Sequence, residues 1–119
     1  MKFKDYYKIL ELENTKVTID QLNDALSNNA ATAKDTYEKK YLEVSGKIGT
    51  IDSDLKYISV VSSTDEWDIV GMHCTIKNDT QRNAVRQLSK DQNIIVKGKI
   101  TSVGEVLGYY MDLTEVIPN

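Results

Sequence analysis

The sequence predicts a small, mainly β domain in which five strands form a barrel, preceded by one or more helices. Residues 42–51 (LEVSGKIGTI) and 94–103 (IIVKGKITSV) resemble each other, and both alternate apolar and polar side chains as half-buried strands do. Each copy has a glycine, Gly46 or Gly98, on its apolar side, which permits a sharp bend or a close backbone approach. Two long, bent strands far apart in one short chain favour a closed barrel.

The first 40 residues carry helical patterns. Residues 4–13 have the apolar spacing of a short helix, and residues 14–17 break it. Thr18 followed by Gln21 forms a capping box, a signal for the start of a second helix. Over residues 19–38, apolar or small side chains recur every three or four positions, which predicts one continuous helix.

Five strand patterns follow, over residues 41–51, 56–61, 68–76, 93–103 and 109–117. Alternate side chains of a strand face opposite sides, so the apolar ones are expected to point inward. The expected inward residues are Leu42, Val44, Ile48, Ile58, Val60, Val70, Met72, Cys74, Ile76, Val96, Ile100, Met111 and Leu113. Between the third and fourth strands, Thr80 is a candidate N-cap for a helix over residues 81–88.

Three strands, a helix and two more strands is the element order of the OB-fold, a five-stranded Greek-key barrel. In that fold the first and fourth strands are neighbours. Residues 41–51 and 93–103 are therefore expected to pair antiparallel and to bend near Gly46 and Gly98. OB-folds usually bind ligands on the face of their second and third strands and with the loops after the first and fourth.

The junction between helix and barrel also resembles a known family. Asn29, Ala33 and Tyr37 stand four residues apart and are followed by KKYLEVSGKI and later by IIVKGKI. This combination is similar to the bacterial tRNA_anti-like OB-fold family, over about residues 18–117. The resemblance implies a fold like that of the anticodon-binding domains of synthetases, in a family whose biochemical role is largely undefined. From the residues alone, the three helix positions are expected to seat the helix on the barrel.

Charge and rare residues limit the classes of function. The 119 residues have 15 basic and 18 acidic side chains, and the net charge of −3 arises after residue 40, which disfavours general binding of polyanions. Cys74 is the single cysteine and His73 the single histidine, which excludes an internal disulfide and metal sites built on several such ligands. No cofactor and no metal is expected. Cys74 is expected in the core, and His73 on the surface rather than in a catalytic role.

The predicted domain organisation is a helical extension, residues 1–17, and an OB-fold domain with its leading helix, residues 18–119. No apolar run approaches the roughly 18 residues of a membrane span, and the N-terminus lacks the apolar core of a signal peptide. We expect a cytoplasmic protein if Met1 is the native start, and an exported one if a signal has been removed.

Aromatic and basic residues predict a non-enzymatic binding module, with single-stranded nucleic acid or a peptide-like chain as the ligand. Tyr57 has outward parity on the second strand and Trp67 precedes the third, so both are candidates to stack on bases. Lys47 and Lys56 are candidates to contact phosphates. No nucleophile–base pair, phosphate loop or paired-carboxylate motif points to an enzyme.

The alternative is a protein-interaction or structural domain that binds no nucleic acid, which the negative charge favours. In that interpretation, aromatic side chains close the barrel or pack under the helices, and outward lysines keep the sheet soluble. The residues open to both interpretations also include Lys97, Lys99, Tyr109 and Tyr110.

Overall fold

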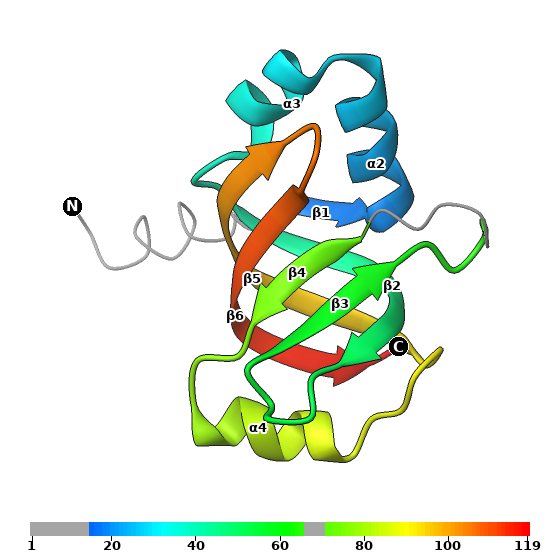
Figure 1. Ribbon diagram of the computed structural model, residues 1–119, viewed down its shortest axis with the longest axis vertical. Helices are drawn as coiled ribbons and strands as arrows, with labels where there is room; N and C mark the ends of the chain where they lie inside the picture. The colour runs from blue at the N-terminus through cyan, green and yellow to red at the C-terminus, as the bar shows by residue number, and fades with distance from the viewer. Residues whose placement is uncertain (1–14, 66–70) are drawn as a thin grey trace, which may run out of the picture.

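The computed structural model describes residues 15–65 and 71–119, in which there are six strands and three helices (Figure 1). The strands are β1 (Thr15–Thr18), β2 (Tyr41–Ile51), β3 (Tyr57–Val61), β4 (Met72–Thr75), β5 (Asn93–Gly104) and β6 (Gly108–Pro118). The helices are α2 (Ile19–Asn28), α3 (Ala30–Tyr37) and α4 (Asp79–Arg86). The helix predicted over residues 4–13, and the start of the strand predicted over residues 68–76, lie outside the described residues.

Strands β2 to β6 form a closed barrel. They follow one another in the order β2, β3, β4, β6, β5, and β5 pairs with β2 to complete the circle. β4 and β6 run parallel, and the other barrel pairs are antiparallel. This is the Greek-key barrel of the OB-fold, so the predicted fold class is confirmed. Helices α2 and α3 cover one end of the barrel and α4 covers the other (Figure 1).

The two similar segments pair with each other, as predicted. Val44 of β2 lies opposite Val96 of β5 in an antiparallel register. Gly46 and Gly98 are both buried. A Cβ atom on Gly46 would lie 2.6 Å from Cγ1 of Val60 on β3 and 3.0 Å from Cγ2 of Ile19 on α2, both closer than an ordinary carbon contact. The absent side chain therefore lets α2 pack closely on the barrel.

These two strands share one irregular position, and β5 has a second one. β5 shifts its register against β6 twice, between Lys97 and Gly98, where the bend was expected, and between Ile100 and Ser102. β2 shifts its register against β3 at Gly49, three residues after the glycine predicted to mark its bend. Gly49 and Thr101, the residues left without a partner at these shifts, occupy equivalent places in the two similar segments. Because a β-bulge adds one residue to a strand and bends it, the similarity of the two segments extends to a bulge that they share.

The region predicted as one helix is two helices. Thr18 does begin α2 with a capping box: the Gln21 amide donates to Thr18 Oγ1 at 3.1 Å, and the Thr18 amide donates to Gln21 Oε1 at 2.8 Å. The chain then breaks at Asn29, whose φ of −162° and ψ of 99° are extended. Its side chain accepts a hydrogen bond from the Thr32 amide at 3.1 Å and caps α3. Asparagine suits a cap better than a helix interior, which explains the break.

β1 lies where the sequence predicts a break, at residues 14–17. It pairs in parallel with β2, with Val17 opposite Val44. Four residues are too few for a clear period-two pattern, so this strand depends on the edge that β2 offers. β1 spans the boundary predicted between residues 17 and 18, and the division into an extension and a domain stays a prediction.

Helix α4 begins earlier than predicted. Its N-cap is Asn78 rather than Thr80, and Asn78 Oδ1 accepts a hydrogen bond from the Gln81 amide at 3.0 Å. Both residue types suit an N-cap, so the sequence alone does not decide between them. The Gln81 side chain is buried and donates from Nε2 to the Leu113 carbonyl at 2.8 Å, which ties α4 to β6.

The core fills the barrel, and the expected inward residues within the described ranges are all buried. Their exposed fractions are 6% or less. Val70 is the one expected core residue that lies outside the described ranges. Burial raises the pKa of the Cys74 thiol, so this core cysteine stays protonated and is poorly reactive.

Tyr109 joins the barrel to the helices that cover it. The residue is fully buried, and its hydroxyl donates to the Leu22 carbonyl of α2 at 2.7 Å. Its ring meets the Tyr37 ring of α3 edge to face, with centroids 6.1 Å apart. This is the packing role that the alternative interpretation assigns to tyrosines, and it removes Tyr109 from the candidates for ligand stacking.

Stability is expected to fall at alkaline pH because of Tyr109. Burial, with a smaller contribution from the charge of Tyr37, raises the pKa of Tyr109 to about 12. An unfolded tyrosine ionises near pH 10, so between about pH 10 and 12 the folded state binds more protons than the unfolded state, and stability falls as pH rises. Thermal unfolding across this range should show a smaller loss in Tyr109→Phe than in the wild type. Equal pH slopes would contradict the assignment.

Candidate functional site

Three aromatic side chains from three neighbouring strands stack on the outer face of the barrel. They are Tyr57 of β3, His73 of β4 and Tyr110 of β6. The ring centroids of Tyr57 and His73 lie 4.4 Å apart, with an interplanar angle of 25°. Those of His73 and Tyr110 lie 4.7 Å apart, with an angle of 26°. We call these three residues the aromatic ladder.

Strand register explains the ladder. His73 lies opposite Tyr110 across β4 and β6, and it lies diagonally from Tyr57, because its direct partner on β3 is Ser59. Neighbouring strands are about 4.8 Å apart, a spacing that suits rings standing side by side. The three residues are half-buried. Neighbouring rings cover each other, so the ring edges and the outer faces of the two end rings are what the ladder offers to a ligand.

Of the four predicted site residues, the structure brings two together. Tyr57 belongs to the ladder, and the exposed Lys56 directly precedes it. Lys47 lies opposite Val61, at the far end of β3 from Tyr57, and its Nζ lies 3.6 Å from the carboxylate of Asp91. Trp67 lies outside the described residues, so its stacking role stays a prediction.

The other outward lysines of the β2–β5 wall also have partners. Lys97 Nζ lies 3.7 Å from Glu43 Oε1 and 3.5 Å from Glu115 Oε2. Lys99 Nζ lies 6.0 Å from the centroid of the Tyr41 ring. Since carboxylates neutralise most of this row, it is a set of local charge pairs rather than a continuous basic stripe.

Charged side chains of both signs border the ladder on its α4 side. Lys56 lies beside Tyr57, and Asp112 lies opposite Lys99 in the register of β5 and β6. The Asp112 carboxylate is 3.6 Å from Lys77 Nζ. With Asp52 and Asp54 of the neighbouring β2–β3 loop, three carboxylates match the three ammonium groups. Phosphate binding here is therefore expected to be modest.

The sequence does not single out His73 and Tyr110 as members of one site. The outward parity predicted for His73 is confirmed, but stacking with tyrosines on both sides depends on which strands are neighbours. Parity with the inward Met111 and Leu113 does separate the outward Tyr110 from the buried Tyr109, but it does not place Tyr110 beside His73. The usable signal was the outward parity of Tyr57 and His73 together with the OB-fold order, which makes the third and fifth strands adjacent.

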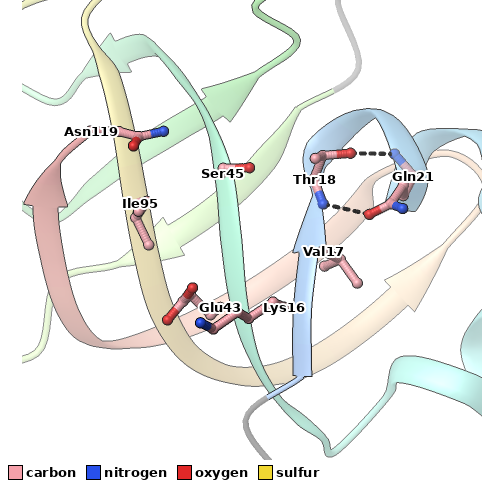
Figure 2. Close-up of a pocket in the computed structure, with 8 residues that line it drawn as sticks. All are labelled: Lys16, Val17, Thr18, Gln21, Glu43, Ser45, Ile95 and Asn119. Carbon is pink, nitrogen blue, oxygen red and sulfur yellow. Dashed lines mark hydrogen bonds between the residues drawn. The ribbon is translucent and has the colours of Figure 1, made fainter.

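A separate hollow lies on the outer face of β1, β2 and β5 (Figure 2). We call it the β1 hollow; its volume is about 310 Å³, and its lining includes Lys16, Thr18, Gln21, Glu43, Ser45 and Ile95. Lys16 and Glu43 stand opposite each other in the β1–β2 register, so their charges offset. No aromatic side chain is among its lining residues, so it offers no surface for stacking a planar group.

Two classes of site are absent from the described part of the chain. Within residues 15–65 and 71–119, no three histidine, cysteine, aspartate or glutamate side chains gather to hold a metal ion. None of the helices described there is long and apolar enough to cross a membrane.

Solved structures resemble this chain at low sequence identity. A lipoprotein from Klebsiella pneumoniae, named as a candidate nucleic-acid-binding protein, has a TM-score of 0.68 and 15% identity, and the match covers 91% of this chain and 95% of that one. Replication protein A from U. maydis, bound to single-stranded DNA, has a TM-score of 0.52 and 10% identity over 89% and 72%. Asparaginyl-tRNA synthetase from Entamoeba histolytica has a TM-score of 0.50 and 16% identity over 69% and 21%. At these identities, the likeness shows the fold alone.

A search among curated proteins finds no significant match. The sequence model of the tRNA_anti-like family does match, over residues 5–107. That range includes barrel strands β2 to β5 and the helices at both ends of the barrel. The chain therefore belongs to the tRNA_anti-like family and has the OB-fold that its sequence predicts.

Proposed function

We propose that this domain binds single-stranded nucleic acid, with the aromatic ladder as its stacking surface. The observation that carries the proposal is the stack of Tyr57, His73 and Tyr110 on the outer face of β3, β4 and β6. β3 and β4 are the second and third strands of the barrel, the pair on which OB-folds usually bind. A base stacked on an aromatic side chain contributes about 1–3 kcal/mol and needs an unpaired base, so single strands should be preferred to duplexes.

The role we propose is binding rather than catalysis. The single histidine of the chain is held between two tyrosine rings, an arrangement that supports ring stacking rather than attack on a substrate. Lys56 and Lys99, which border the ladder, are the proposed phosphate contacts, and Trp67 stays a proposed second stacking residue. Lys47 is a weaker candidate because its ammonium group pairs with Asp91 at 3.6 Å.

Fluorescence anisotropy with a labelled oligonucleotide tests the proposal. We expect the wild type to bind single strands more tightly than duplexes, and Tyr57→Ala to weaken binding about 5- to 150-fold, the factor that corresponds to 1–3 kcal/mol. Binding should weaken as salt rises, with a log–log slope of about −1 to −2, because each phosphate contact on a single strand contributes about −0.7.

Tyr41→Ala is the matched control for this measurement. Tyr41 is 42% exposed on β2 and does not belong to the ladder, although Lys99 Nζ lies 6.0 Å from its ring centroid, so its removal should weaken binding far less than Tyr57→Ala does. If both variants lose affinity equally, the ladder is not the binding surface. If the wild type binds no single strand even at low salt, the proposed function is wrong.

A protein-interaction domain is the second candidate. The net charge of −3 and the pairing of Lys97 with two carboxylates favour it, because both reduce the attraction for phosphates. In this case the ladder and the exposed hairpin between β5 and β6 would face a protein. The absence of any oligonucleotide binding at low salt, from a fully folded sample, would favour this candidate over the first.

The cellular location is part of the same proposal. The likeness to the Klebsiella lipoprotein supports an exported location over a cytoplasmic one. Fractionation of cells that express the protein from its own gene separates the two, and the result decides which single strands the domain encounters.

A further inference from the structure

At the Tyr110 end of the ladder, the side chains next to the outer face of the ring are short. β6 lies between β4 and β5, so one face of the Tyr110 ring meets His73 and the other is turned toward β5. The residue opposite Tyr110 on β5 is Ser102, and Thr101 precedes it. Both are exposed and short. Neither side chain has the size to cover a tyrosine ring.

The bare surface continues along β5. Gly104 stands two residues beyond Ser102 and so faces the same side of the strand. A Cβ atom added to Gly104 would meet no heavy atom within 4 Å. We call Ser102 and Gly104 the hairpin shelf. Two strongly exposed apolar residues follow at the hairpin tip, Val106 at 84% and Leu107 at 71%.

The opposite end of the ladder is less suited to a nucleotide. There the free face of Tyr57 is turned toward β2, where Asp52 hydrogen-bonds through its amide to the Tyr57 carbonyl at 3.1 Å. The Asp52 carboxylate accepts a hydrogen bond from the Lys56 amide at 3.0 Å, and Asp54 follows in the same loop. These two carboxylates oppose a phosphate placed beside Tyr57. The two residues of the hairpin shelf carry no charge, and one carboxylate, that of the exposed Glu105, follows them in the hairpin.

We propose that a nucleobase stacks on the β5-facing side of Tyr110, over the hairpin shelf, and extends the aromatic ladder by one ring. This inference rests on the proposed function and names where on the face the base is held. The shelf admits a planar group because it has no side chain larger than a hydroxymethyl group. The exposed Val106 and Leu107 offer apolar contact to the sugar or to the next base. The proposed base site adjoins the β5–β6 hairpin, which follows the fourth barrel strand and is one of the loops that OB-folds usually use.

Ser102→Ile tests the inference without touching the ladder. Isoleucine would cover the Tyr110 ring but offers no aromatic ring on which a base could stack, so affinity for a labelled oligonucleotide should fall about 5- to 150-fold. Ser102→Ala leaves the shelf open and should bind like the wild type. Ser45→Ile makes the same change at an outward position of β2, in the β1 hollow (Figure 2), and should also bind like the wild type.

The outcomes separate the inference from the proposed function. If the wild type binds, Tyr57→Ala weakens binding and folded Ser102→Ile does not, the base site at Tyr110 is wrong and the proposed function stands. If Ser45→Ile weakens binding instead, the oligonucleotide lies in the β1 hollow, and the base site at Tyr110 and the stacking surface proposed on the ladder are both wrong. If the wild type binds no oligonucleotide, the proposed function fails first. Circular dichroism melts of each variant establish that it is folded.

Discussion

Replacing Gly98 by alanine is expected to destabilise the protein by about 3 kcal/mol or more, at or above the upper end of the range for overpacked cores. The glycine is buried where β5 shifts register against β6. A Cβ atom there would run into the carbonyl oxygen of Asp112 and the side chain of Met111. A flexible side chain can move away, but the carbonyl belongs to the paired strand and moves only if the barrel opens.

Gly104→Ala is the matched control, since it makes the same change in the same strand. Nothing lies within 4 Å of a Cβ atom there. Removing a glycine at an unstrained position restricts the unfolded chain, so stability should be unchanged or higher by up to about 1 kcal/mol. Chemical denaturation of Gly98→Ala and Gly104→Ala measures the free energy of unfolding of each variant and tests this difference. Equal stabilities would show that β5 and β6 do not approach closely at Gly98.

Tyr109→Ala is expected to cost about 3–5 kcal/mol, the range for removing a large buried aromatic side chain. The change deletes the edge-to-face contact with Tyr37 and the hydrogen bond to the Leu22 carbonyl, so it also loosens the helices that cover the barrel. Tyr109→Phe keeps the ring and should cost only about 1–3 kcal/mol, because a buried carbonyl loses its donor.

The neighbouring Tyr110→Ala should show the opposite pattern. Tyr110 is half-buried and contributes a cross-strand ring contact, so its loss should cost about 1 kcal/mol of stability. Its effect should appear in oligonucleotide affinity instead. Thermal melts and anisotropy on both variants test this division. A Tyr110→Ala protein that is as unstable as Tyr109→Ala, with no specific loss of binding, would contradict the proposed roles.

The sequence by itself determined the parts of this protein that depend on local patterns. Period-two alternation identified the barrel strands and their inward residues, and the capping box at Thr18 located the start of α2. The similarity of residues 42–51 and 94–103 identified two strands that pair. These signals lie within about ten residues of chain, where side-chain direction follows directly from backbone geometry.

Only the tertiary structure decided which outward side chains form a site. Tyr57, His73 and Tyr110 lie on three strands, and their stacking depends on β4 lying between β3 and β6. The same holds for the lysines: whether an ammonium group is available to a phosphate depends on the carboxylate of a neighbouring strand, as for Lys97 and Glu43. The position of a residue in a strand determines which face of the sheet its side chain is on. Its contacts with neighbouring strands depend on their register, and the packing of the whole barrel sets that register.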